Sequence, residues 1–169
     1  MSSDMVTVYL SLGSNMGDRE TNLKKAIELL SHRLRLGLVS SIYETEPVGV
    51  PEQPRFLNMA CQLFTRLAAK DLLVLFKGFE STMGRASNPS TAPRPIDIDI
   101  LLYGDQVIKT DDLVIPHPRL TERAFVLVPL AEIAPDLVHP VNVKTVKELL
   151  ESVAGKEGVV KWERKAKEG

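Results

Sequence analysis

Hydrophobic residues recur along the chain at two spacings, one typical of helices and one typical of strands. Apolar positions three to four residues apart run from Leu23 to Leu34 and again from about Ala69 to Met83, which predicts two amphipathic helices. Gly37 is expected to end the first helix. Segments rich in β-branched and aromatic residues predict strands at 6–12, 38–45 and 56–67, with a further strand through Asp97 and Asp99.

The order of these elements is strand, helix, strand, strand, helix, strand, which is the ferredoxin-like pattern. We therefore expect an α+β fold with an antiparallel sheet, and one domain over residues 1–169 whose last residues, from about 163, fray. Both long helices should cover one face of the sheet, which leaves the other face for loops and ligand. Further helices at about 125–133 and 146–153 and a short strand near 159–162 should complete the domain.

Composition narrows the class of protein. The 169 residues are 44% apolar and 25% charged with a net charge of −1, which does not favour nucleic acid or an anionic membrane as a partner. No basic leader and no long apolar span is visible, so we expect a cytoplasmic protein. The single cysteine, Cys61, lies in an apolar stretch and is expected to be a small buried hydrophobic residue.

Two carboxylates in the last predicted core strand are the main candidates for chemistry. Side chains alternate along a strand, so Asp97 and Asp99 share one face while Ile96, Ile98 and Ile100 share the other. Two acids about 6.5–7 Å apart on one strand face repel each other, and a divalent cation such as Mg²⁺ would reverse that cost. The alternative is a solvent-facing strand with two ordinary surface acids.

Arginines flank this acidic pair. Arg94 lies three residues before Asp97, and Arg85 lies at the far end of the same polar loop. Metal ions and guanidinium groups together suit a polyphosphate, because both neutralise charge that develops during phosphoryl transfer. Taken singly, each arginine is better explained as a solvated loop residue, and only its place beside Asp97 and Asp99 favours the functional interpretation.

Three further motifs have both a functional and a structural interpretation. Phe56 and Asn58 share a strand face and could stack on and hydrogen-bond a flat heterocycle, or they could be a core and a capping residue.

His117 is fixed between prolines, near Arg119 and Arg123, and could contact a phosphate or act as an acid or base. The segment from Gly13 to Asn15 fits an anion-binding strand-to-helix turn, or plain turn and capping chemistry.

Taken together, these segments resemble the 6-hydroxymethyl-7,8-dihydropterin pyrophosphokinase family of folate biosynthesis. The most specific match is Pro93-Arg94-Pro-Ile-Asp97-Ile-Asp99-Ile-Leu. The other matches follow in the family's order: Leu10-Ser-Leu-Gly-Ser-Asn15, Tyr43-Glu-Thr45-Glu-Pro, Gln53-Pro-Arg-Phe56-Leu-Asn58, Glu80 with Gly84-Arg85, Ile115-Pro-His117-Pro, Arg123-Ala-Phe125-Val-Leu-Val-Pro-Leu and Glu132-Ile-Ala-Pro135.

The resemblance implies transfer of the β,γ-diphosphate of ATP to the hydroxymethyl oxygen of the pterin, with release of AMP. It implies that Asp97 and Asp99 hold two Mg²⁺ ions and that Arg85 and Arg94 close over the phosphates. The nucleotide side implied by the family comprises Lys77, Glu80, Ile100, His117 and Arg123. The pterin side comprises Thr45, Glu46, Val48, Phe56, Asn58 and Phe125.

Two other functions remain as alternatives. A Mg²⁺-dependent nucleotidyltransferase would also use a Gly-Ser turn and an Asp-x-Asp strand, although these elements lie far apart in this sequence. A non-catalytic ferredoxin-like domain that binds a ligand would leave the acids and arginines without a role. For the enzyme we expect small-molecule partners only, with no nucleic acid and no membrane, and a monomeric state.

Overall fold

The computed structural model describes residues 5–45, 55–84 and 95–162. Within these residues the chain forms an antiparallel sheet whose strands follow the order β5-β1-β4-β3-β8, with β2 also paired to β4. The strands of this sheet are β1 (Val6–Ser14), β2 (Arg35–Val39), β3 (Tyr43–Thr45), β4 (Phe56–Thr65), β5 (Asp97–Tyr103) and β8 (Val159–Lys161). The prediction of a mixed helical and antiparallel β domain is confirmed.

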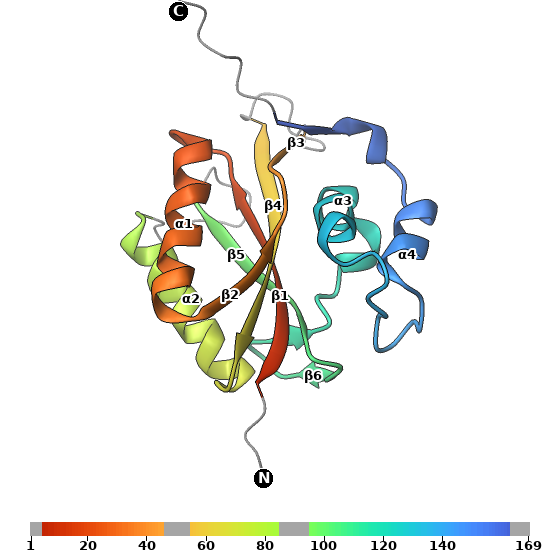
Figure 1. Ribbon diagram of the computed structural model, residues 1–169, viewed down its shortest axis with the longest axis horizontal. Coiled ribbons are helices and arrows are strands. Elements are labelled where there is room, and N and C mark those ends of the chain that lie inside the picture. The colour runs from red at the N-terminus through yellow and green to blue at the C-terminus, as the bar shows by residue number, and fades with distance from the viewer. Residues whose placement is uncertain (1–4, 46–54, 85–94, 163–169) are drawn as a thin grey trace, which may run out of the picture.

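Helices cover both faces of the sheet (Figure 1). The long helices α1 (Arg19–Arg33) and α2 (Ala69–Thr82) lie together on one side, as the sequence predicts. The helices α3 (Ala124–Ile133) and α4 (Val146–Ser152) lie on the other side. The expectation that this second face is left to loops and ligand is therefore wrong over much of its area.

Each face has its own apolar core, and alternation along the strands assigns residues to them. Val8, Leu10 and Leu12 of β1 pack toward α1 and α2 with Met59 of β4, whereas Tyr9 belongs to the cluster under α3 and α4. The second cluster joins the sheet to α3 through Ala60, Leu102, Val126, Leu127 and Leu130. Cys61 is fully buried in the first cluster, as predicted.

The first helix begins at a side-chain cap and ends at a backbone hydrogen bond from the Leu34 amide to the Leu30 carbonyl. The Asp18 carboxylate accepts a hydrogen bond from the Thr21 amide at 3.1 Å, which caps the N-terminus. The helix ends at Arg33, before Gly37, so the prediction that Gly37 stops it is wrong. Gly37 lies inside β2, where an added Cβ would stand 2.5 Å from Gln62 Oε1 and 2.8 Å from Phe64 Cε2. Close approach of neighbouring side chains requires glycine here.

The predicted strand 38–45 is two short strands with a break between them. At the break, the Ser40 amide donates to the Ala60 carbonyl at 2.9 Å, and the Ser40 hydroxyl accepts from the Ala60 amide at 2.8 Å. The hydroxyl thus takes the place of a backbone carbonyl, so β4 keeps its partner while the neighbouring chain bends. After the break, Tyr43 donates a 2.6 Å hydrogen bond to Glu132 of α3.

The remaining elements connect the core to its second layer. They are β6 (Ile108–Lys109), β7 (Val114–Ile115), and the 3₁₀ turns η1 (Leu120–Glu122) and η2 (Lys156–Gly158). β6 and β7 form a separate two-stranded sheet. His139 is buried, and its Nδ1 accepts from the amides of Val141 and Asn142. Across the described residues, no helix is both long and apolar enough to cross a membrane.

Candidate active site

The two predicted acids lie on β5, the strand that forms one edge of the sheet. Asp97 pairs in register with Gly13 of β1, and Asp99 pairs with Ser11. The alternating neighbours Ile98 and Ile100 are each 5% exposed and point into the core under α1 and α2. Asp97 and Asp99 therefore share the opposite face of the sheet, as strand geometry predicts.

The electrostatics of Asp99 reflect this crowding of acids. Burial, followed by the charges of Asp97 and Glu80, raises the pKa of the Asp99 carboxyl to about 7, against the opposing charge of Arg123. A hydrogen bond with the Asp97 carboxyl acts in the same direction. The two side chains are thus close enough to share a proton, an arrangement that is costly for two anions and that a bound cation would relieve.

Glu80, a residue of α2, approaches β5 from the face of the sheet that α1 and α2 cover. Its side chain is 7% exposed, and its Oε2 accepts a 2.7 Å hydrogen bond from the amide of Ile98. This contact ties α2 to β5 at the residue between the two aspartates. The carboxylate of Glu80 also contributes to the raised pKa of Asp99. A role for Glu80 on the nucleotide side stays a prediction.

Arg123 and His117 supply the donors on the other side of the acidic pair. Arg123 lies at the N-cap of α3, within electrostatic range of both aspartates, and its guanidinium stands 5.4 Å from the centre of the Phe125 ring. His117 is held by its amide, which donates to the Leu101 carbonyl at 3.0 Å. Its Nδ1 accepts from the Arg119 amide at 3.2 Å, so we assign the ring proton to Nε2.

The environment of His117 favours the neutral ring. Burial lowers the pKa of His117, and the nearby Arg123 lowers it further, while Asp97 acts in the opposite direction. A neutral imidazole with its proton on Nε2 is a hydrogen-bond donor that adds no charge of its own.

A second group of predicted residues lies where β3 and β4 pair. Tyr43 stands opposite Asn58, and Thr45 stands opposite Phe56. Asn58 is 4% exposed, and its Oδ1 is buried without a hydrogen-bond partner in the part of the chain that the structure describes. Thr45 Oγ1 is likewise buried and unpartnered there. Because such atoms are costly unless something binds them, this pair points to a polar ligand.

Gly13 makes room for Asn58, a role that the interpretation as a turn missed. β1 continues to Ser14, so Gly13 is a strand residue opposite Asn58 on one side and Asp97 on the other. An added Cβ would stand 2.9 Å from Asn58 Nδ2 and 3.6 Å from Phe56 Cδ1. Ser11, buried and in register with Asp99, was also missed. In the sequence, large apolar residues (Leu10 and Leu12) alternate with small ones (Ser11 and Gly13), and this alternation predicts that Ser11 and Gly13 share the face opposite the leucines.

The structure says less about the function of the other predicted site residues. Lys77 is exposed on α2, and the Ile100 side chain is in the core, so only its backbone could contact a ligand. Glu46, Val48, Arg85 and Arg94 lie outside the described residues, as does the predicted frayed tail. No group of three or more metal-binding side chains occurs within the described ranges, so the aspartate pair would need phosphate or water oxygens to complete a metal's coordination.

Comparisons with known proteins agree with this geometry. Residues 9–135 match the family model described as 7,8-dihydro-6-hydroxymethylpterin-pyrophosphokinase (HPPK). A 2-amino-4-hydroxy-6-hydroxymethyldihydropteridine pyrophosphokinase of Bacillus subtilis is 43% identical over 160 residues, which cover 94% of this chain and 91% of the relative. One from Aquifex aeolicus is 45% identical over 144 residues, covering 85% and 90%.

A solved structure shows the same fold at lower sequence identity. The crystal structure of Plasmodium falciparum HPPK-DHPS A437G superposes with a TM-score of 0.71 at 18% identity, covering 87% of this chain and 45% of that one. At this identity the likeness concerns the fold alone, and this chain spans less than half of that protein. The family match over residues 9–135 and the two bacterial relatives carry the assignment. The chain belongs to the 7,8-dihydro-6-hydroxymethylpterin-pyrophosphokinase family.

Proposed function

We propose that this chain transfers the β,γ-diphosphate of ATP to the hydroxymethyl oxygen of 6-hydroxymethyl-7,8-dihydropterin. The oxygen forms a bond to the β-phosphorus, the bond from that phosphorus to the α–β bridging oxygen breaks, and AMP leaves with this oxygen. The hydroxyl proton is released. Family membership supports the reaction, and the observation that carries it in this chain is the close carboxyl pair, Asp97 and Asp99, on the sheet face that also holds Asn58.

Asp97 and Asp99 would hold the Mg²⁺ on which ATP chemistry depends. Their fit to the ion rests on two carboxyl groups that repel each other and whose charges a cation would balance. When bound, Mg²⁺ neutralises charge on the triphosphate oxygens. The family resemblance implies two such ions.

His117 and Arg123 are proposed to bind the nucleotide. The guanidinium of Arg123 offers positive charge near the acidic pair, and the Nε2–H of His117 offers a neutral donor. Both orient anionic oxygens without taking part in proton transfer. Lys77, Glu80 and the backbone of Ile100 would complete this side. Arg85 and Arg94, which precede β5 in the sequence, are proposed to neutralise the phosphates during transfer.

Thr45 and Asn58 are proposed to read the edge of the pterin ring. Asn58 Oδ1 can accept from a ring or amino N–H, and Thr45 Oγ1 can donate or accept, which would satisfy both buried atoms. Phe56, half-buried beside them, and Phe125, which lies under Arg123, offer the aromatic faces on which a flat ring stacks. Glu46 and the backbone of Val48 would add contacts from the segment that follows Thr45.

The scaffold for this site is proposed to be the ferredoxin-like fold. The strand order β5-β1-β4-β2, with α1 and α2 on one face, matches the βαββαβ pattern, and β3 and β8 extend the sheet. Residues 1–169 are proposed to act as a single domain and a monomer in the cytoplasm.

Product analysis tests the proposal. The purified chain is incubated with ATP, Mg²⁺ and 6-hydroxymethyl-7,8-dihydropterin, and the nucleotide products are separated. We expect AMP that appears only when both pterin and metal are present. Release of inorganic pyrophosphate would instead indicate a nucleotidyltransferase. The absence of any pterin-dependent product, with pterin still bound, would favour a non-catalytic domain.

A further inference from the structure

Arg19, the first residue of α1, joins two points of the chain that flank the proposed pterin site. Its Nη1 donates to Glu44 Oε2 at 3.0 Å and to the Arg55 carbonyl at 2.6 Å. Glu44 directly precedes Thr45, and Arg55 directly precedes Phe56. One guanidinium thus links the strand end that carries Thr45 to the strand start that carries Phe56 and, two residues later, Asn58.

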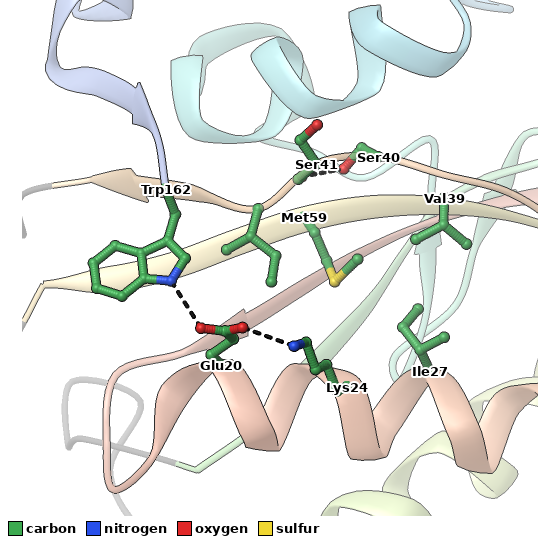
Figure 2. A pocket seen from close by; sticks show the side chains of 9 residues that line it. Glu20, Lys24, Ile27, Val39, Ser40, Ser41, Met59 and Trp162 are labelled. Carbon is green, nitrogen blue, oxygen red and sulfur yellow. Dashed lines mark hydrogen bonds and ion pairs between the residues drawn. The ribbon is translucent and has the colours of Figure 1, made fainter. Parts of the chain in front are cut away.

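Trp162 lies against the same guanidinium. The centre of its ring is 5.2 Å from Arg19 Cζ, within the range of a cation–π contact. Its Nε1 donates to Glu20 Oε1 at 3.1 Å, and its amide donates to the Ile42 carbonyl at 2.8 Å. Figure 2 shows the indole joined to Glu20, which in turn pairs with Lys24 at 2.8 Å. Trp162 is therefore fixed to α1 and to the residue that precedes β3.

The strand that leads into Trp162 supports β3 directly. β8 pairs with β3 in register, with Val159 opposite Thr45 and Val160 opposite Glu44. Thr45 is at the same time opposite Phe56 of β4. The three-residue strand β3 is therefore held between β4 and β8, and without β8 it would be an exposed edge.

A cavity beside Trp162 explains why its polar contacts matter. The cavity has a volume of about 410 Å³ and is lined by residues of α1, the β2–β3 segment, Met59 and Trp162, without any of the predicted site residues (Figure 2). The indole packs against the core cluster under α1 and α2 but borders open space on this side, so apolar packing fixes it only in part. Its hydrogen bond to Glu20 and its contact with Arg19 hold it in place.

We propose that Arg19 and Trp162 are positioning residues for the pterin half of the active site. This inference rests on the proposed function. Arg19 supports the pairing of Thr45 with Phe56 by holding Glu44 and the Arg55 carbonyl, together with the 3.6 Å ion pair between Arg55 and Glu44, and Trp162 with β8 keeps Arg19 and β3 in place. Trp162 lies outside residues 9–135, the part of the chain that matches the family model. The contacts of Arg19 and Trp162 lead to α1, β3 and the start of β4, whereas the proposed nucleotide half centres on β5 and the start of α3.

Paired kinetics of two variants and one control test the proposal. Arg19→Ala removes the link, Trp162→Leu removes the ring and its N–H, and Arg35→Ala is the control. The Arg35 guanidinium lies 5.8 Å from the Phe64 ring centre near the far end of β4, so its loss removes a contact of the same kind away from the site. We expect the KM for pterin to rise about tenfold in the first two variants, the scale of losing one charge-assisted contact. The KM for ATP should stay within about twofold, and both constants should be unchanged in the control.

Conservative variants and a spectroscopic signal separate positioning from general instability. Trp162→Phe keeps a ring over Arg19 but loses the N–H that binds Glu20, so it should restore part of the pterin affinity that Trp162→Leu loses. Trp162 is the single tryptophan, so a red shift of its emission in Arg19→Ala would report an indole released to water. A general loss of structure would raise both KM values together and lower the midpoint of thermal unfolding.

The outcomes also separate this inference from the proposed function. An active wild-type chain whose pterin KM is unchanged in Arg19→Ala, or rises together with the ATP KM, would overturn the positioning role alone. If the wild-type chain produced no pterin-dependent AMP, calorimetric pterin affinity would replace KM in the same comparison. Failure of the wild-type chain to bind pterin would overturn both.

Discussion

The two faces of β5 differ in burial and in charge, although they belong to the same seven residues. On one face Ile98 and Ile100 are 5% exposed in an apolar core. On the other, Asp97 and Asp99 lie close together, and burial with the charges of Asp97 and Glu80 raises the pKa of Asp99 to about 7. The isoleucine face stabilises the fold, whereas the aspartate face lowers stability and carries the residues proposed for catalysis. Single substitutions at neighbouring positions should therefore change different properties.

The largest expected effect belongs to Asp99→Ala. We expect kcat/KM to fall at least 100-fold, about 3 kcal/mol of transition-state stabilisation, because a proposed metal ligand is lost. The free energy of unfolding at pH 7 should be unchanged or higher, since the substitution removes a carboxyl that Asp97 and Glu80 oppose. Steady-state rates and urea unfolding measure the two quantities.

A matched control for this variant is Asp105→Ala. Asp105 is exposed just beyond the other end of β5, so its loss should alter neither rate nor stability. An Asp99→Ala protein that turns over like the wild type would remove Asp99 from the chemistry. One that loses stability as much as activity would show that the two faces do not divide these roles.

The next effect concerns the space that Gly13 leaves for Asn58. In Gly13→Ala the added Cβ would stand 2.9 Å from Asn58 Nδ2, so the amide must shift. We expect the pterin KM to rise about tenfold, since a displaced hydrogen-bonding group costs roughly 1–2 kcal/mol. Gly78→Ala is the control, because a Cβ there meets nothing within 4 Å and α2 should gain slightly in stability. Equal pterin KM values in both variants would contradict the role of Gly13 in placing Asn58 for pterin.

Ile100→Val should have a smaller effect, and on stability alone. Removing one methylene from the core should lower the free energy of unfolding by about 1 kcal/mol. The KM for ATP should not change, because the Ile100 side chain packs under α1 and α2. Urea unfolding and ATP saturation curves are the measurements. A raised ATP KM at unchanged stability would mean that the side chain contacts nucleotide after all.

Features set by a local period could be predicted from the sequence, and features set by tertiary contact could not. The alternation that places Asp97 and Asp99 on one face and Ile98 on the other depends only on strand geometry, and the structure confirms it. Gly37 was misread because its close neighbours, Gln62 and Phe64, come from another strand. Periodicity predicts a helix at α3 but not which face of the sheet it covers.

The contacts around Trp162 were the hardest to anticipate. Glu20 and Trp162 are 142 positions apart and meet only because β8 pairs with β3. The unpartnered atoms of Thr45 and Asn58 likewise depend on the pairing of β3 with β4. Sequence reasoning reached these two residues through the family resemblance, because the pattern of residues alone left Asn58 open to a capping role.

Cys61 gives the smallest prediction and tests how closed the apolar face is. Burial raises the pKa of the Cys61 thiol to about 12, whereas an exposed thiol ionises near pH 8.5. In alkaline solution the unfolded chain therefore loses its thiol proton first, which stabilises the unfolded state. The free energy of unfolding should fall as pH rises above about 8.5, by about 1 kcal/mol at pH 9.5, and continue to fall until about pH 12.

Comparison with Cys61→Ala isolates this contribution from the other groups that titrate in the same range. Urea unfolding at pH 7 and pH 9.5 should show a loss about 1 kcal/mol larger in the wild type than in the variant. The native thiol should also react slowly with a thiol reagent at pH 8, because the thiolate is the reactive form and burial suppresses it. Equal losses in the two proteins, or rapid labelling of the native chain, would mean that water reaches the face under α1 and α2. The apolar face would then not be closed to water, and the contrast with the face that carries Asp97 and Asp99 would be wrong.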